Sequence, residues 1–151
     1  MNEGVQWGGV AALTGNQDCV EEMKCQYRRR RELIVKGLNN IEKISCLWPK
    51  GAFYAFANIS GTGLKSQEFA MRLLQEQHVV VVPGTGFGQG GEGFIRLSYA
   101  TSEKSIQEGL RRMEAFVKGH LSPQKLGEIY ALHFRKEGLS VFLIRKVENC
   151  S

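Results

Sequence analysis

The sequence predicts an α/β fold, in which helices pack on a small β-sheet and a long helix precedes them. Two observations indicate this class. Residues 17–40 repeat apolar side chains at steps of three, four or seven, which is the pattern of one helix face about six turns long. Short runs of β-branched and aromatic residues then alternate with further helical patterns, as in a domain that has one mixed core.

The composition is typical of a folded globular chain. Its 151 residues are 42% apolar and 23% charged, which suits one domain with a real core and argues against global disorder. The longest apolar runs are too short to cross a bilayer, and residues 1–9 lack the basic start and apolar centre of a signal peptide. We therefore expect a soluble, cytoplasmic protein with no membrane partner.

Much of the net charge of +5 comes from one run, Arg28 to Arg31. Such a run could bind nucleic acid or an acidic partner. Acidic residues flank it and no aromatic residue interrupts it, so a solvated helix face is the favoured interpretation. We expect no nucleic-acid partner.

The four cysteines and three histidines show no metal-binding spacing. No cysteine pair has the C-x-x-C pattern, and no histidine lies near one in a zinc-ligand pattern. We expect reduced, mostly buried thiols and no metal site.

The first half of the chain begins with helical patterns. Residues 6–13 have the pattern of a helix end, with no capping residue upstream, and the long helix of residues 17–40 follows. Residues 44–48 and 52–59 predict two strands. The tripeptide Pro49-Lys50-Gly51 between them has the residues that a turn favours.

The second half alternates helix and strand signals. Ser66 is expected as the N-cap of a helix through residue 77. Residues 79–82 are four valines and predict a buried strand, and residues 94–100 predict another. A last helical pattern covers residues 103–118.

The tail of residues 119–151 differs from what precedes it. Residues 119–123 have linker composition, and residues 124–137 have a helical pattern. We find no motif in this tail and leave it unassigned.

The most distinctive stretch is a glycine-rich segment with six glycines in residues 84–93. Gly86, Gly88 and Gly91 formally match the dinucleotide fingerprint G-x-G-x-x-G. That site requires a strand, the loop and then a helix whose N-terminus faces the pyrophosphate. Here a second strand follows the loop, and no Walker lysine is present. We therefore expect a long connection between two strands and not a phosphate site.

The strand after this loop contains one charged residue, Arg96. Strand alternation places it on the same face as Phe94, Ser98 and Ala100, among small or hydroxyl-bearing neighbours. A buried unpaired guanidinium would be very costly. Three interpretations remain open from the residues alone: a solvated edge position, an internal salt bridge, or a carboxylate receptor that uses the planar arginine fork.

Three motifs together carry a resemblance to a known family. In order and spacing, residues 6–118 resemble the C-terminal part of class I/II aminotransferases, which are pyridoxal-phosphate enzymes of the aspartate aminotransferase type (fold type I). The motifs are Pro49-Lys50-Gly51-Ala52-Phe53-Tyr54, Val82-Pro83-Gly84 with Phe87-Gly88, and Gly91-Glu92-Gly93-Phe94-Ile95-Arg96-Leu97-Ser98-Tyr99-Ala100.

The resemblance implies a domain organisation. Residues 1–16 would be a remnant of the family's large domain, which binds the cofactor. Residues 17–118 would be the interdomain helix and the small C-terminal domain, with a small mixed or antiparallel sheet and helices packed on it. Because Trp7, Val10 and Leu13 would normally pack on the large domain, we expect an exposed apolar patch there.

The resemblance also implies a function. Family members move an amino group from an amino acid to a 2-oxo acid, and the role of binding the substrate α-carboxylate falls on Arg96. The family's Schiff-base lysine and cofactor-binding residues belong to the large domain, so we assign no catalytic or cofactor-binding residue here. We expect the chain to bind pyridoxal phosphate weakly and to be inactive alone.

An alternative is a non-catalytic binding or regulatory module that retains Arg96. The family is homodimeric, but the domain that mainly forms the dimer lies outside the resemblance, which leaves the oligomeric state open.

Overall fold

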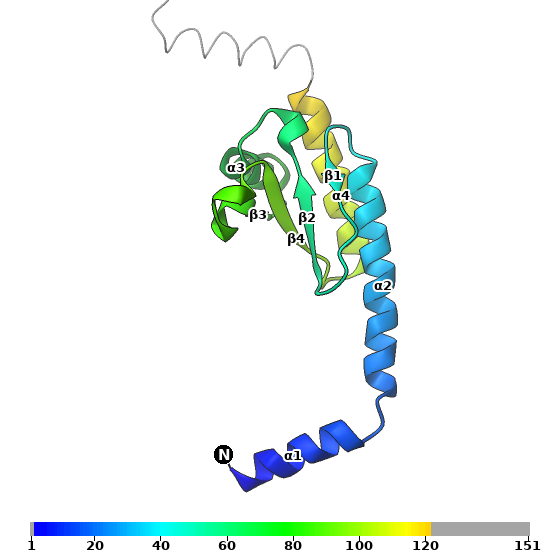
Figure 1. Ribbon diagram of the computed structural model, residues 1–151. Helices are drawn as coiled ribbons and strands as arrows, with labels where there is room; N and C mark the ends of the chain where they lie inside the picture. Colours follow the sequence, from blue (N-terminus) through cyan, green and yellow to red (C-terminus); the bar gives the residue numbers. More distant parts are fainter. Residues whose placement is uncertain (1, 122–151) are drawn as a thin grey trace, which may run out of the picture.

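Two helices joined at an angle lead into a small sheet that is covered by helices (Figure 1). The computed structural model describes residues 2–121. The first two helices are α1 (Glu3–Thr14) and α2 (Asp18–Asn39). The elements that follow are β1 (Ser45–Cys46), β2 (Tyr54–Asn58), the 3-10 turn η1 (Ser60–Thr62), α3 (Ser66–Gln77), β3 (Val82–Pro83), the 3-10 turns η2 (Gly84–Phe87) and η3 (Gln89–Gly91), β4 (Phe94–Ser98) and α4 (Glu103–His120).

The four strands form one sheet in the order β1-β2-β4-β3, and every neighbouring pair is antiparallel. β4 is therefore an interior strand. Arg96 in β4 lies opposite Phe56 of β2 and opposite Val82 of β3. The expected α/β class, with helices on a small sheet, is confirmed.

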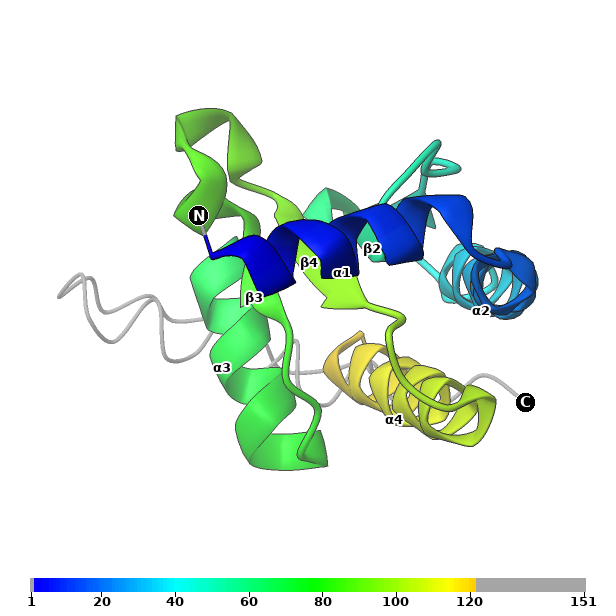
Figure 2. The same cartoon turned by 90° about the horizontal axis from the view of Figure 1, so that it is seen from below.

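The helices of the described part of the chain cover one face of this sheet. Figure 2 shows α3 and α4 on the same side, and the C-terminal part of α2 packs against α4, β1 and β2. Ala55, Ala57 and Ile95 point toward these helices and are fully buried. The core also contains Leu38 from α2, Phe69 and Leu73 from α3, and Met113, Phe116 and Val117 from α4. Each large apolar side chain buried in this way contributes about 1.5–3 kcal/mol. Within residues 2–121, no helix lies over the opposite face of the sheet, which carries Arg96.

Two predicted strands are much shorter in the structure. For residues 44–48 only β1 remains. On its outer edge, the Asn39 amide donates to the Cys46 carbonyl at 3.0 Å, and the Asn39 side-chain oxygen accepts from the Cys46 N–H at 2.9 Å. For residues 79–82 only Val82 pairs in the sheet. The preceding valines follow directly from the left-handed C-cap of α3 at His78.

The helix starts differ from the prediction in two places. Asn2 caps α1, with its side-chain oxygen accepting from the Gly4 N–H at 3.0 Å, so the expectation of an uncapped helix was wrong. Lys65, and not Ser66, is the N-cap of α3, although its side chain makes no capping hydrogen bond. Ser102 caps α4 through the Ser105 N–H at 3.1 Å.

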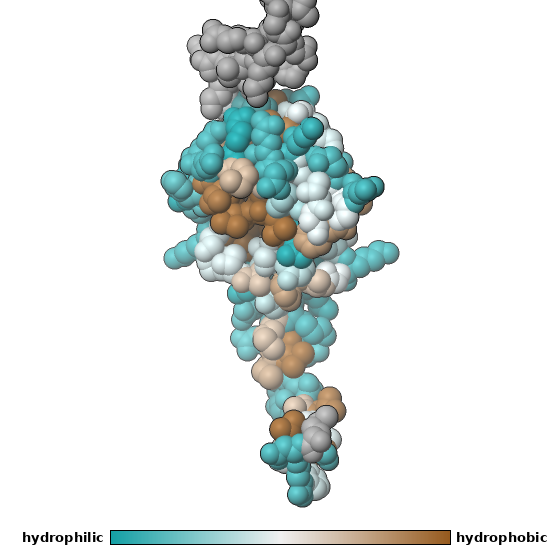
Figure 3. All heavy atoms as spheres, turned by 90° about the vertical axis from the view of Figure 1, so that its left-hand side faces the viewer, coloured by the Kyte–Doolittle hydropathy of each residue, from teal (hydrophilic) through white to brown (hydrophobic). Residues whose placement is uncertain are grey.

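α1 and the first half of α2 extend away from the sheet like a stalk. No residue of α1 is buried, and Trp7 and Leu13 are 66% and 85% exposed. In Figure 3 apolar atoms lie along this narrow part of the molecule. The expected apolar patch is confirmed. On α2 the apolar stripe enters the core only near its C-terminal end, at Ile34, Val35 and Leu38.

Among residues 2–121, no helix is both long and apolar enough to cross a membrane. The same residues hold no cluster of histidine, cysteine, aspartate or glutamate side chains that could bind a metal. Cys46 is buried, but Cys19 and Cys25 are exposed, so the expectation of mostly buried thiols was wrong for two of the three described cysteines. The helical pattern at residues 124–137 lies outside the described residues.

Candidate functional site

Arg96 lies on the uncovered face of the sheet, in the middle of an interior strand. This position excludes the interpretation of a solvated edge residue. No salt bridge between the described residues involves its side chain. A half-buried guanidinium with no carboxylate partner in this part of the chain is therefore available to an external anion.

Two aromatic rings hold the Arg96 guanidinium. Its central carbon lies 4.3 Å from the centre of the Tyr54 ring and 4.4 Å from that of the Phe87 ring. Both distances are well within the range of a cation–π contact. Tyr54 belongs to β2 and Phe87 to η2, which follows β3, so the rings come from elements that flank β4 on its two sides. The residues around Arg96 are thus aromatic, and not mainly small or hydroxyl-bearing as expected.

Further aromatic residues on the same face support Phe87. Phe56, directly opposite Arg96, stacks on Phe94 with ring centres 5.2 Å apart and meets Phe87 edge-on at 6.2 Å. Phe56 and Phe87 remain 40% and 52% exposed. The open face therefore presents exposed aromatic rings around one cation.

The glycine-rich loop carries Phe87 to this place. It connects β3 to its antiparallel neighbour β4, which confirms a strand-to-strand connection and rules out the dinucleotide geometry. Within the loop, the backbones of Gly84 and Gly91 touch. A Cβ built on Gly84 would overlap the Gly91 carbonyl oxygen, and one built on Gly91 would overlap the Gly84 carbonyl. Glycine at both positions lets the loop close on itself just before Phe87 and just before β4.

The far end of the loop is anchored to the start of α3. The buried Ser66 hydroxyl accepts from the Gly93 and Phe94 N–H groups at 2.8 and 3.1 Å. In return, the Glu92 carboxylate accepts from the Ser66 N–H at 2.8 Å, and this backbone hydrogen bond is the main cause that lowers the pKa of Glu92. Glu92 therefore accepts a hydrogen bond from an N–H group in the first turn of α3, which is the function of an N-cap side chain, although it belongs to the loop.

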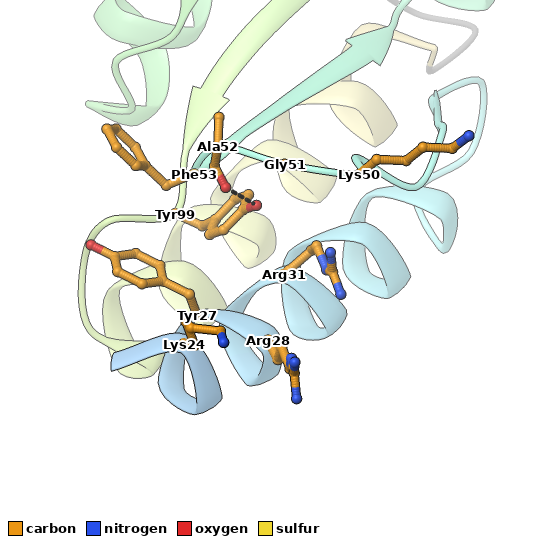
Figure 4. A pocket seen from close by; sticks show the side chains of 9 residues that line it. All are labelled: Lys24, Tyr27, Arg28, Arg31, Lys50, Gly51, Ala52, Phe53 and Tyr99. Carbon is orange, nitrogen blue, oxygen red and sulfur yellow. Dashed lines mark hydrogen bonds between the residues drawn. The ribbon is translucent and has the colours of Figure 1, made fainter. Parts of the chain in front are cut away.

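A pocket of about 560 Å³ lies between α2 and the turn that leads into β2 (Figure 4). On its wall, the Tyr99 hydroxyl donates to the Ala52 carbonyl at 2.9 Å, and the Tyr27 ring lies 6.2 Å from that of Phe53. The Phe53 ring in turn contacts Tyr54, with ring centres 4.5 Å apart. The pocket wall thus supports the residue that flanks Arg96.

Among the described residues that line this pocket, four are basic and none is acidic. Figure 4 shows that their side chains do not converge: Lys24 lies beside Tyr27, whereas Lys50 extends in the opposite direction. Lys24 is paired with Glu21 at 2.8 Å, and Arg31 donates to the Pro49 carbonyl at 3.1 Å. These contacts serve the fold and do not form a ligand cage.

The four consecutive arginines do not form one solvated helix face. Arg28 and Arg29 are exposed, but Arg30 lies over the Tyr27 ring at 5.5 Å and Arg31 over the Trp48 ring at 5.1 Å. The expectation of a solvated face therefore holds only for the first two.

Sequence reasoning found Arg96 but missed the roles of Tyr54 and Phe87. Both lie within the motifs quoted above, as the last residue of Pro49–Tyr54 and as the aromatic residue inside the glycine-rich loop. An aromatic residue at the exposed tip of a loop was the available signal.

Comparison with known proteins gives consistent matches. The sequence model of the family described as "Aminotransferase class I and II" matches residues 2–113. The chain is 48% identical over 117 residues to an aspartate aminotransferase of Pyrococcus horikoshii, and 45% identical over 116 residues to aromatic-amino-acid aminotransferase 2 of Thermococcus litoralis. Each match covers 76% of this chain and 30% of the relative.

Solved structures agree. An aromatic aminotransferase from Pyrococcus horikoshii OT3 matches 76% of this chain and 31% of its own, with a TM-score of 0.73 and 43% identity. The aspartate aminotransferase of Rhizobium meliloti matches 73% of this chain and 30% of its own, with a TM-score of 0.69 and 40% identity. The chain thus spans about 30% of the length of the relatives that it matches. Because the family match covers well over half of the chain and the fold agrees, this chain belongs to the class I and II aminotransferases.

Proposed function

We propose that this chain supplies the substrate carboxylate receptor of a pyridoxal-phosphate-dependent aminotransferase, and that Arg96 is that receptor. The reaction would transfer an amino group between an amino acid and a 2-oxo acid. The observation that carries the proposal is the Arg96 guanidinium on the open face of the sheet, held by aromatic rings and without a carboxylate partner among the described residues.

The chemistry of the guanidinium suits this role. Its parallel N–H groups match the two oxygens of a carboxylate, which gives two charge-assisted hydrogen bonds. In a transamination between an α-amino acid and a 2-oxo acid, both substrates carry a carboxylate next to the reacting carbon, and one receptor can therefore serve both.

We propose a division of the chain that follows from this role. Residues 1–16 are assigned to the end of the large domain, and residues 17–118 to the interdomain helix and the small domain. Residues 119–151 remain unassigned. The exposed apolar side chains of α1 support the first assignment, because a surface of that kind normally packs on another body.

The described residues do not fit pyridoxal phosphate as its main binding site. In this family the cofactor supplies an electron sink for the reaction. It needs a lysine within reach, yet the strand residues that share the open face with Arg96 include no lysine. Three of the described lysines, at positions 24, 36 and 118, are in exposed ion pairs within helices. We infer that this chain by itself binds the cofactor weakly and does not transaminate.

A titration of Arg96 with an amino acid tests the receptor role. In ¹⁵N-labelled protein, L-phenylalanine should shift the side-chain Nε–Hε signal of Arg96, whereas L-phenylalaninamide, which lacks the carboxylate, should not. The Arg96→Lys variant assigns the signal, because lysine has no Nε–Hε group and the signal disappears. Arg29→Lys, on the exposed surface of α2, is the matched control and should leave the response intact. An equal response to acid and amide would disprove the receptor role.

The alternative is a binding or regulatory module derived from an aminotransferase. One observation favours it: the sheet and its helices enclose a core of their own, while Arg96 stays accessible. Such a module would show the carboxylate response of Arg96 without any transaminase activity in its native context. A full-length product of the same gene that transaminates would exclude it.

A further inference from the structure

We propose that Tyr54 and Phe87 are positioning residues that clamp the Arg96 guanidinium, so that its plane is set and its N–H groups stay free before a carboxylate arrives. This inference rests on the proposed receptor role of Arg96. It adds that the function of the glycine-rich loop is to place Phe87 against the Arg96 guanidinium.

The clamp differs from an ordinary salt bridge because it leaves the N–H groups of the guanidinium free. An arginine side chain has many rotamers, and ordering it on binding costs roughly 0.5–1.5 kcal/mol. A carboxylate partner within the protein would order it but would occupy the N–H groups that the substrate needs. The faces of Tyr54 and Phe87 attract the cation through their π-electrons and accept no paired hydrogen bond from it. Aromatic rings therefore order the guanidinium while its donors remain available.

The position of Phe87 is itself determined by the fold. Phe56 meets the Phe87 ring edge-on and is in turn stacked on Phe94. The contact between Gly84 and Gly91 closes the loop at the base of the segment that carries Phe87. Tyr54 has equivalent support from Phe53, which packs on Tyr27 of α2. Each half of the clamp is thus held by a separate part of the structure.

The geometry makes a spectroscopic prediction that is independent of ligand. Nuclei above the face of an aromatic ring are shifted upfield, so the Arg96 Nε–Hε signal should lie upfield of those of the exposed arginines. In Phe87→Leu this shift should shrink, and rotation of the guanidinium should become faster. Phe87→Tyr restores a ring and should restore both properties.

The carboxylate titration then tests the consequence. Phe87→Leu should weaken the response of Arg96 to L-phenylalanine by roughly twofold to tenfold, which corresponds to the cost of ordering one arginine side chain on binding. Tyr54→Leu should act in the same direction, whereas Tyr54→Phe keeps the ring and should bind as the unchanged protein does. Because Phe87 is 52% exposed, its replacement should leave the core intact. Unchanged methyl signals of Ile95 and Met113 would verify this.

The outcomes separate the two proposals. Loss of both the upfield shift and affinity in Phe87→Leu, with recovery in Phe87→Tyr, supports the clamp. An unchanged Arg96 signal in Phe87→Leu, or unchanged affinity despite a changed signal, overturns it and leaves the receptor role standing. If the unchanged protein shows the upfield shift but Arg96 does not respond to the carboxylate, the receptor role fails, and the positioning function inferred from it fails as well.

Discussion

Arg96 and His120 show two ways in which this chain accommodates a basic side chain. Arg96 keeps its charge on an open face between two aromatic rings. His120, at the end of α4, is only 6% exposed. Its Nδ1 atom lies 3.3 Å from Nη1 of Arg72, which is a permanent donor, so Nδ1 must accept and the ring is neutral in this arrangement. The surroundings of His120 therefore keep its ring neutral, whereas the guanidinium of Arg96 is a permanent cation.

The buried position of His120 predicts a pH-dependent stability. Burial, followed by the charge of Arg72, lowers the pKa of His120, and these effects exceed the opposing ones of the Thr62 carbonyl, Glu68 and Glu76. Between the lowered pKa and the ordinary value near 6.5, the unfolded chain binds more protons than the folded one. Stability that is present above about pH 6.5 should therefore be lost as the pH falls.

Urea unfolding at pH 5 to 8 measures this effect. His120 changes the free energy of unfolding by at most about 1.4 kcal/mol per pH unit. His120→Gln should remove that part of the pH dependence, because its side chain can still accept from Arg72 but does not titrate. His78→Asn, at an exposed position with a left-handed backbone, should keep it. Parallel pH profiles for the unchanged protein and His120→Gln would contradict the prediction.

At the scale of elements, the glycine-rich loop and α3 stabilise each other. Ser66 at the start of the helix binds backbone N–H groups at the end of the loop, and Glu92 from the loop binds the helix start. This reciprocal arrangement resembles a capping box built from two distant segments. It explains why Ser66, which looks like an N-cap in the sequence, is instead fully buried inside the first turn.

The close approach of Gly84 and Gly91 predicts a sharp difference between two glycine substitutions. Gly84→Ala should cost on the order of 2 kcal/mol, because the new methyl group meets two backbone carbonyls that cannot move away as a side chain can. That corresponds to a fall in Tm of roughly 10 °C. Gly86→Ala, in the same turn with open space around it, is the matched control and should be nearly neutral. Thermal unfolding followed by circular dichroism compares the two, and equal Tm values would refute the role of the contact.

At the scale of the whole molecule, the chain combines a closed core with an exposed stalk. The core lies between the sheet and α2, α3 and α4, whereas α1 and the start of α2 contribute nothing to it. The open face with Arg96 and the apolar side of the stalk are the two surfaces that a larger assembly would use.

Reduction with borohydride tests the expectation of weak cofactor binding. After incubation with one equivalent of pyridoxal phosphate and reduction, intact mass should show only a minor adduct, spread over several exposed lysines. The reason is that Lys24, Lys36 and Lys118 are held in exposed ion pairs within helices, and the strand residues that share the open face with Arg96 include no lysine. A stoichiometric adduct on one lysine, abolished by replacing that lysine with arginine, would show that the chain does carry a Schiff-base site.

Local patterns predicted much of the fold. The helical periodicities located α2, α3 and α4, and the alternation in residues 94–100 placed Arg96 on the face opposite Ile95. The strand lengths were predicted less well, because a local pattern does not show how many residues find a partner strand: only Ser45 and Cys46 of residues 44–48 pair with β2. The start of α1 was missed at Asn2, a capping residue close to the chain start.

By itself, the sequence determined the types of element, the face that Arg96 occupies and the family to which the chain belongs. Only the tertiary structure decided what surrounds Arg96. The strand order makes β4 an interior strand. Loop closure at Gly84 and Gly91 brings Phe87 to the Arg96 guanidinium, which Tyr54 of β2 also contacts. The physical reason is the sequence separation of the interactions. Periodicity predicts from neighbouring residues which way a side chain points, whereas its contact partners depend on strand pairing and backbone contacts between segments far apart in the chain.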